Sequence, residues 1–171
     1  MVYLVRKLVL SRWPDGENLI YDNNINHLSA DCITKELNTS SNQLSWWKAE
    51  NDLDLNGIAV SYCSKIVTGT DKFWFIKLPF EELTEKFIIK NTPENGYTAI
   101  PKMKEKHYDM CNLNYESLGQ IGDIIANATS SVKNIYKVKV KQALKDLKDL
   151  LDAGEVDVNL LGKYSKEKLV P

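Results

Sequence analysis

The chain has 171 residues and a formal net charge of −1, with 43% hydrophobic and 26% charged residues. This length suits one hydrophobic core and excludes two independent domains of ordinary size, and the composition is that of an ordinary globular protein. Because the charges nearly balance, no global field attracts nucleic acid, anionic lipid or an acidic substrate. We therefore expect no nucleic-acid partner.

Membrane and secretory classes are excluded on similar grounds. No stretch approaches the roughly 18 consecutive apolar residues of a spanning helix, and the N-terminus lacks a basic region before a long apolar stretch. Cys32, Cys63 and Cys111 are irregularly spaced, so we expect no disulfide framework. A reducing cytoplasm is the compartment these features favour.

The first part of the chain alternates short strands with short helices. The β-branched and apolar residues over 2–10 predict a strand, and Ser29 is placed to cap a short helix over 30–37. Residues 44–48 predict a second strand. Apolar residues at three- and four-residue spacing predict an amphipathic helix over 55–66.

The middle of the chain continues in the same manner. The aromatic run at 73–76 predicts a central strand, and the proline that opens 79–83 predicts a helical turn. Two more strands are expected over 87–89 and 97–100. An Asn-Gly turn at 93–96 separates them.

The C-terminal third has helical periodicity. Residues 115–128 predict one helix, and Ser130 or Ser131 caps a second that runs to Ala153, with Gly154 as its stop. On the second helix the apolar residues fall at alternating four- and three-residue spacing, at Tyr136, Val140, Ala143, Leu147 and Leu150.

These elements predict a single α+β domain spanning residues 1–171. Residues 1–110 should form a mixed sheet with short helices. Residues 111–154 should form a C-terminal helical pair packed on the sheet, and residues 155–171 a tail.

An unbroken run of six uncharged hydrogen-bonding residues at 38–43 leads into Trp46 and Trp47. It predicts either a ligand pocket or a surface loop. In the pocket, one tryptophan is a stacking surface and the polar contacts are Thr39, Ser40, Ser41 and Asn42. In the loop, the hydroxyls bond to nearby backbone and the tryptophans point to opposite strand faces, so one should be partly exposed or covered by another element.

Histidine and cysteine raise the question of zinc. His27 and Cys32 are five residues apart, and His107 and Cys111 are four apart, which suits one face of a helix. These spacings match no strong zinc pattern, so we predict no metal site. The polar aromatic cluster His107-Tyr108-Asp109 indicates either a general acid or base or a helix start with Asp109 as its cap, and we expect the helix start. No nucleophile elbow or glycine-rich phosphate loop is present.

A lysine stripe marks the predicted second helix. Its members recur at four-residue spacing, with one further lysine close by: Lys133, Lys137, Lys141, Lys145 and Lys148. Like charges so placed repel one another, so the stripe indicates either contact with an acidic partner or a nucleic-acid backbone, or a solvated face whose lysine stems cover apolar edges. With the apolar spacing, it favours a protein partner or a homodimer through the C-terminal helix.

Three segments, at 3–7, 28–34 and 42–46, together resemble a family of small uncharacterised prokaryotic proteins. That resemblance implies no activity.

The order of several features is similar to that of ADP-ribosyltransferases of the arginine–serine–glutamate type. Arg6 stands for the early strand arginine, Thr39-Ser40-Ser41 for the serine motif, and the helix over 55–66 for the helix that follows. The resemblance implies NAD as cofactor and a later catalytic glutamate, for which Glu94 and Glu105 are nearest in order.

We therefore expect a cytoplasmic binding or protein-interaction protein without a cofactor. Its ligand-binding candidates are Arg6, Thr39, Ser40, Ser41, Asn42, Trp46 and Trp47. The alternative is an NAD-using, ADP-ribosyltransferase-like or other nucleotide-binding enzyme. A pocket that holds Arg6 and Ser40 together would favour the enzyme, and an exposed apolar seam from Tyr136 to Leu150 would favour a partner interface.

Overall fold

The computed structural model describes residues 1–13 and 32–170, except for the side chain of Ser11. The predicted helix cap at Ser29, the start of its helix and His27 lie outside the described residues. The remainder of that helix, Cys32–Glu36, is a single π-helical turn, η2.

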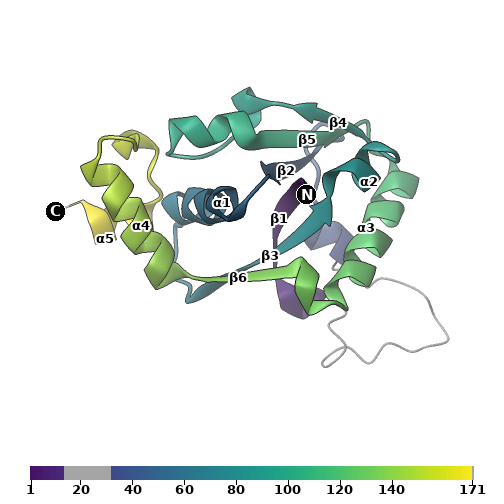
Figure 1. The fold of residues 1–171 in the computed structure, drawn as a ribbon, viewed down its shortest axis with the longest axis horizontal. Coiled ribbons are helices and arrows are strands. Elements are labelled where there is room, and N and C mark those ends of the chain that lie inside the picture. The colour runs from purple at the N-terminus through teal and green to yellow at the C-terminus, as the bar shows by residue number, and fades with distance from the viewer. Residues whose placement is uncertain (14–31, 171) are drawn as a thin grey trace.

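One antiparallel sheet organises the molecule (Figure 1). Its six strands, in the spatial order β4-β5-β2-β1-β3-β6, are β1 (Tyr3–Leu8), β2 (Leu44–Ala49), β3 (Lys72–Pro79), β4 (Ile88–Asn91), β5 (His107–Cys111) and β6 (Ile135–Lys139). Every neighbouring pair is antiparallel. The single α+β domain is therefore confirmed, and the predicted mixed sheet is wrong.

The position of β1 explains that error. A strand, a helix and a strand in succession usually give parallel neighbours, and β2 and β3 do run in the same direction because each is antiparallel to β1. However, β1 lies between them. The helix that crosses over from β2 to β3 therefore creates no parallel pair.

Five α-helices complete the described fold: α1 (Asp52–Ser64), α2 (Phe80–Thr84), α3 (Tyr115–Thr129), α4 (Val140–Asp152) and α5 (Lys163–Leu169). The predicted helices at 55–66, 79–83 and 115–128 are confirmed as α1, α2 and α3. Across the part of the chain that the structure describes, no helix has the length and apolar character needed to cross a bilayer.

Short helical turns connect these elements: η1 (Leu10–Arg12), η3 (Pro93–Asn95), η4 (Pro101–Lys106), η5 (Val132–Asn134) and η6 (Val158–Leu160). Residues 97–100 form no strand, contrary to the prediction. Thr98 Oγ1 accepts a hydrogen bond from Ile100 N at 3.1 Å, so this segment satisfies part of its backbone locally.

Helices cover both faces of the sheet (Figure 1), and both Trp46 and Trp47 are buried. Trp47 is 5% exposed in the core that contains α1 and α4, and Trp46 is 0% exposed in the core that contains α2 and α3. The prediction that they point to opposite faces is confirmed. Each is covered by helices of its own side.

The C-terminal third differs from the predicted helical pair. Residues 135–139 form β6, in which Val138 is buried while Lys137 and Lys139 are exposed. This alternation suits a sheet edge, where a backbone ladder with β3 is available. The second helix begins only at Val140. Moreover, α3 and α4 belong to opposite cores and do not form a pair.

The segment expected as a tail packs against the end of α1. Gly162 N donates to Ser64 O at 2.8 Å, and Tyr164 N donates to Ile66 O at 3.1 Å. Ser165 Oγ donates to Cys63 O at 2.5 Å. The last carbonyls of a helix have no partner within it, so Gly162 and Ser165, at the start of α5, satisfy two of those of α1.

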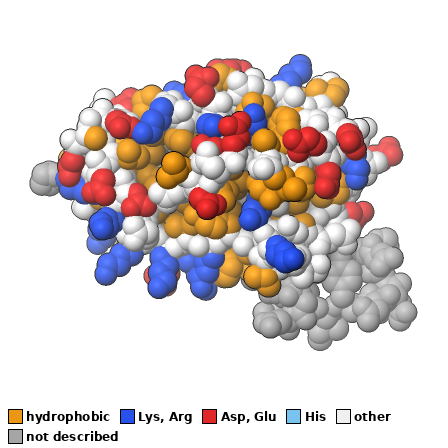
Figure 2. Space-filling model, in the orientation of Figure 1, with side chains coloured by type: hydrophobic (Ala, Val, Ile, Leu, Met, Phe, Trp, Pro, Cys, Tyr) orange, Lys and Arg blue, Asp and Glu red, His pale blue; other side chains and the backbone are white. Residues whose placement is uncertain are grey.

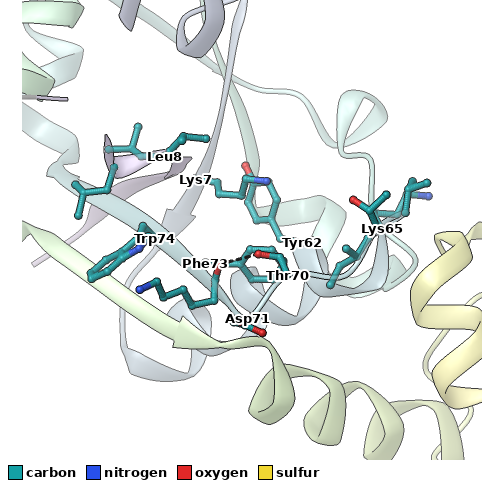
Figure 3. A pocket seen from close by; sticks show the side chains of 14 residues that line it. Lys7, Leu8, Tyr62, Lys65, Thr70, Asp71, Phe73 and Trp74 are labelled. Carbon is teal, nitrogen blue, oxygen red and sulfur yellow. Dashed lines mark hydrogen bonds between the residues drawn. The ribbon is translucent and has the colours of Figure 1, made fainter. Parts of the chain in front are cut away.

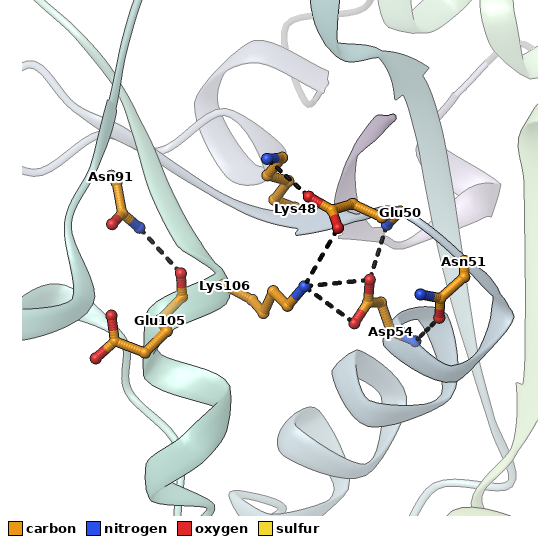
Figure 4. A network of polar contacts seen from close by, with 7 residues as sticks. All are labelled: Lys48, Glu50, Asn51, Asp54, Asn91, Glu105 and Lys106. Carbon is orange, nitrogen blue, oxygen red and sulfur yellow. Dashed lines mark hydrogen bonds and ion pairs between the residues drawn. The ribbon is translucent and has the colours of Figure 1, made fainter. Parts of the chain in front are cut away.

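A charged network ties the start of α1 to η4 (Figure 4). Lys106 Nζ lies 3.2 Å from a carboxylate oxygen of Asp54 and 4.0 Å from one of Glu50, which also pairs with Lys48 at 2.9 Å. Asn51 caps the helix by accepting from Asp54 N at 3.0 Å. Such partly exposed pairs stabilise weakly one by one, but here they share one corner of the fold.

Candidate functional site

A polar pocket opens beside β1, where its pairing with β2 ends. The two strands are in register from Tyr3 opposite Ala49 to Val5 opposite Trp47. Arg6 comes next, and its guanidinium donates from Nη1 to Ser45 O at 2.6 Å and from Nη2 to the carbonyl of Glu36 at 2.7 Å. The side chain of Arg6 therefore links β1 to β2 and to the end of η2.

Every described residue that lines this pocket has a polar side chain. Its volume is about 390 Å³, and its lining is Arg6, Asn38, Ser40, Ser41, Gln43, Ser45, Asn95 and Asp109. We call it the Arg6–Asp109 pocket. Small-molecule sites are usually lined mainly by apolar groups with a few polar ones, so a fully polar lining indicates a ligand that is itself polar.

The polar run forms a tight turn at the rim. Ser40 and Gln43 exchange two backbone hydrogen bonds, at 3.0 and 3.3 Å. Between them Ser41 and Asn42 have φ of 53° and 57°, the signs that a type I′ hairpin turn requires. Asparagine tolerates this region, whereas serine is strained there by about 1 kcal/mol or more. The turn presents Ser40 and Ser41 to the pocket.

Asp109 is the buried acid of the pocket. It is 2% exposed and lies on β5 directly opposite Ser45 on β2. Ser45 Oγ donates to its Oδ1 at 3.1 Å, and Thr92 Oγ1 and Asn95 Nδ2 donate to its Oδ2 at 2.9 and 2.7 Å. These three neutral donors fill most of the acceptor positions of a carboxylate, and Oδ1 retains room for another donor.

His107 extends this network into the core. It is 2% exposed, and its Nδ1 lies 2.9 Å from Thr92 O and 3.1 Å from Thr92 Oγ1. Since a carbonyl oxygen only accepts, Nδ1 carries the proton. The edge of the ring contacts Trp47, with centroids 5.2 Å apart. Thr92 thus joins His107 to Asp109 in one buried chain of hydrogen bonds.

Arg6 is the cation of the pocket. Burial lowers the pKa of Arg6 below its ordinary value, while nearby Tyr62 and Glu36 oppose that shift. Its guanidinium lies 5.9 Å from the ring centroid of Trp46. The carboxylate of Glu36 is itself held by Val9 N at 2.9 Å and by an ion pair with Arg12.

The structure brings together three of the seven predicted ligand-binding residues. Arg6, Ser40 and Ser41 line the same pocket, whereas Thr39 and Asn42 do not. Trp46 and Trp47 belong to the two cores, so neither offers an open face for stacking.

Sequence reasoning missed Ser45, Asn95 and the buried state of Asp109. The predicted helix start at His107 is wrong, because His107–Cys111 is strand β5. In a strand, alternate residues share a face. His107 and Asp109 therefore lie on one face of the sheet, directly opposite Trp47 and Ser45 of β2. Reading this segment with a period of two was the signal that could have found the acid.

Of the arginine, serine and glutamate positions that the ADP-ribosyltransferase resemblance implies, only one agrees with the structure. Arg6 lies on the first strand, but Thr39-Ser40-Ser41 precedes β2 and does not lie on a strand. Glu94 and Glu105 are exposed on η3 and η4 and do not line the pocket.

Among the described residues, His107 and Cys111 do not share the helical face that the zinc alternative used. His107 and Cys111 lie four residues apart on a strand, which separates them by about 13 Å. Cys111 Sγ lies 3.5 Å from Asp109 O, and the thiol of Cys32 donates to the carbonyl of Arg12. No group of three or more metal-ligating side chains occurs among residues 1–13 and 32–170.

The lysine stripe is divided among three elements. Lys133 lies in η5, Lys137 in β6, and only Lys141, Lys145 and Lys148 on α4. All five are exposed, and Figure 2 shows basic side chains gathered along the lower left margin, over α4.

The apolar seam of the predicted helix is not exposed. Val140, Ala143 and Leu147 are buried in the core that α4 shares with α1, and Leu150 packs against that core. The observation that would favour a partner interface through this seam is therefore not met.

Comparison of the chain with known proteins found no matching family model, no similar curated protein and no similar solved structure.

Proposed function

We propose that this protein is a cytoplasmic binding protein for a small polar molecule, which it holds in the Arg6–Asp109 pocket. The observation that carries the proposal is the burial of the Asp109 carboxylate among neutral hydrogen-bond donors. This carboxylate is 2% exposed, and its partners among the described residues are neutral donors. Arg6 lines the same pocket, and its described hydrogen bonds go to backbone carbonyls.

The free-energy cost of burying Asp109 without a described ion pair to Arg6 supports a functional reason for its position. Removing one charged group from water costs several kcal/mol even after the protein relaxes around it. A direct ion pair would offset part of that cost, but none joins Arg6 to Asp109 among the described contacts. A ligand between the two groups would contact both.

The donors and acceptors define the class of ligand. Each Nη of Arg6 carries a second hydrogen beyond the one it gives to a carbonyl, and Asp109 Oδ1 can accept again. A carboxamide, which has a carbonyl acceptor beside an N–H donor, matches both. The buried Cys63 and Cys111 are free thiols, which supports a reducing compartment.

Thermal unfolding with nicotinamide, glutamine and NAD as probes tests the proposal. A ligand at a hundred times its Kd raises the free energy of unfolding by about 2.7 kcal/mol. For a domain of this size that corresponds to a rise in Tm of about 5–11 °C. We expect such a shift with at least one carboxamide probe, and no shift with any of them contradicts the proposal.

Two variants locate the binding. Ser40→Ala removes an exposed hydroxyl from the rim, and Asp109→Asn removes the buried charge; both should reduce the shift. Asp123→Asn removes an exposed carboxylate from α3 and is the matched control, which should keep the shift. Equal shifts in all three variants would place the ligand elsewhere.

A second candidate function is an NAD-using transferase or other nucleotide-binding enzyme. The observation that favours it is that Arg6 and Ser40 line one pocket. Asp109 is the one acid among the described residues of that lining, so it would act as the catalytic carboxylate. Release of nicotinamide from NAD, lost in Asp109→Asn, would support this candidate, and no release by the wild-type protein would exclude NAD cleavage.

A protein partner is a separate proposal for α4. Its exposed Lys141, Lys145 and Lys148 suit an acidic protein surface, whereas two copies of the same lysine face would repel each other. A homodimer through α4 would therefore need its buried apolar seam. Sedimentation of the purified protein as a monomer at high concentration would exclude that homodimer.

A further inference from the structure

A larger cleft lies beside β1, separate in its lining from the Arg6–Asp109 pocket. Its volume is about 870 Å³, and it lies between the end of β1, the start of β3 and the end of α1, with the loop from Val67 to Asp71 along one side. Figure 3 shows Leu8 and Trp74 on one side and Lys65 on the other, with Lys7 and Phe73 between them. We call it the Lys7–Trp74 cleft.

The charged side chains of this cleft are mostly basic. Among the described residues, three lysines and one aspartate line it, an excess of two positive charges, and they come from different parts of the fold: Lys7, Lys65, Asp71 and Lys72. None of the three lysines forms an ion pair with a described residue. A concave site of one sign concentrates ions of the other, so the cleft suits an anion.

Lys7 and Lys72 are the two lysines suited to contact that anion. Lys65 instead donates to Leu160 O at 2.5 Å and lies over the ring of Tyr97, so it contributes charge but little contact. Lys7 projects from β1 and Lys72 begins β3. Partial burial lowers the pKa of Lys7, with Glu36 opposing the shift, and a bound anion would favour its charged form.

Aromatic rings share the cleft with these amines. Lys7 Nζ lies 5.5 Å from the ring centroid of Phe73 and 5.8 Å from that of Tyr62, and Lys72 Nζ lies 5.4 Å from that of Trp74. Trp74 is the one tryptophan of the four that is not buried. A partly open ring beside a lysine can stack on a planar base while the lysine contacts a phosphate.

We propose that the Lys7–Trp74 cleft binds a nucleoside phosphate, with its phosphates on Lys7 and Lys72 and its base against the ring of Trp74. The volume of the cleft lies within the range of small-molecule sites, about 300–1,000 Å³. Thr68 and Thr70 add hydroxyls along the loop for the sugar. The proposal does not depend on the function proposed for the Arg6–Asp109 pocket.

Titration calorimetry with ATP, AMP and pyrophosphate tests this assignment, and quenching of Trp74 fluorescence gives a second readout. ATP should bind more tightly than AMP, because it has more charge to place on the lysines, and more tightly than pyrophosphate, which lacks the base. Lys7→Gln and Lys72→Gln should each weaken ATP binding about tenfold or more. Trp74→Leu should weaken ATP about tenfold but leave pyrophosphate unchanged.

Matched controls separate the cleft from general attraction to lysine. Lys141→Gln and Lys145→Gln remove the same charge from exposed positions on α4 and should leave ATP binding unchanged. The proposal is overturned by the absence of ATP binding, by equal losses in the α4 controls, or by pyrophosphate binding as tightly as ATP. It is also overturned if a single-stranded RNA oligonucleotide binds and ATP does not.

Discussion

Gly162 lies against the end of α1 so closely that no side chain fits. A Cβ at this position would lie 2.4 Å from Ile66 O and 2.5 Å from the carbonyl carbon of Lys65. Both are backbone atoms, which cannot rotate away. We expect Gly162→Ala to lower the free energy of unfolding by about 1–3 kcal/mol or more, as overpacking does elsewhere, and urea denaturation measures it.

Gly119 is the control for that substitution. It lies inside α3, and a Cβ there would meet nothing within 4 Å. Gly119→Ala should therefore raise the free energy of unfolding by about 0.5–1 kcal/mol, the usual cost of glycine within a helix. If both substitutions changed stability in the same direction, the described packing of Gly162 on α1 would be wrong.

The Cys63 thiol gives a prediction about alkaline pH. Burial, with a smaller contribution from Asp146, raises the pKa of Cys63 from 9.0 to about 12. Below about pH 9 both states keep this proton. Above it the unfolded chain loses the proton and the folded protein keeps it to about pH 12, so the free energy of unfolding falls as pH rises.

Cys63→Ala isolates that contribution. Between about pH 9 and 12, its free energy of unfolding should fall less steeply than that of the wild-type protein. The two slopes should differ by at most about 1.4 kcal/mol per pH unit. Urea denaturation at a series of pH values measures both slopes. Identical slopes would mean that Cys63 titrates normally in the folded protein.

The candidate site was predictable only in part at the level of single residues. The polar run directed attention to Ser40 and Ser41, and the strand position of Arg6 followed from its β-branched neighbours. Alternation along 107–111 could have put Asp109 on a strand, but it could not place Asp109 in the pocket, because its partners Ser45 and Thr92 lie 64 and 17 residues away in the sequence. Burial of a polar group depends on such distant contacts.

Among the elements, the edge strand β6 carries a testable electrostatic conflict. Lys139 lies directly opposite Lys72 on β3, and like charges in that position destabilise a sheet. We expect Lys139→Glu to raise the free energy of unfolding by about 0.2–1 kcal/mol at low salt. Lys139→Gln removes the repulsion without adding attraction. Its free energy of unfolding should therefore lie between those of the wild-type protein and Lys139→Glu.

Salt provides the check on that prediction. Salt screens exposed charges. The differences in free energy of unfolding among the wild-type protein, Lys139→Gln and Lys139→Glu, measured by urea denaturation, should therefore shrink at high ionic strength. Differences that persist in high salt would point to β-propensity and not to charge.

Element prediction succeeded where periodicity was unambiguous and failed over residues 97–100, at β5 and at β6. Strands β1, β2, β3 and β4 and helices α1, α2 and α3 follow the local pattern. Residues 135–140 satisfy two patterns at once, because Tyr136 and Val140 continue a helical spacing while Val138 and Val140 alternate with Lys137 and Lys139. The free edge of β3 decides between them, and that edge is a tertiary feature.

At the scale of the whole molecule, the central position of β1 organises both proposed sites. Arg6 lines the polar pocket on the β2 side, and Lys7 lines the cleft on the β3 side. The strand order that places β1 between β2 and β3 could not be derived from local sequence. The presence of helices on both faces of the sheet could not be derived from local sequence either. These helices explain why Trp46 and Trp47 are both buried.

Chemical-shift mapping of the uniformly labelled protein with nicotinamide tests whether the Arg6–Asp109 pocket binds a carboxamide. The shifted backbone amides should cluster around this pocket, at Ser40, Ser41, Ser45 and Asn95, and Asp109→Asn should abolish the shifts. Shifts centred on α4, or no shifts with nicotinamide, glutamine or NAD, would contradict that binding.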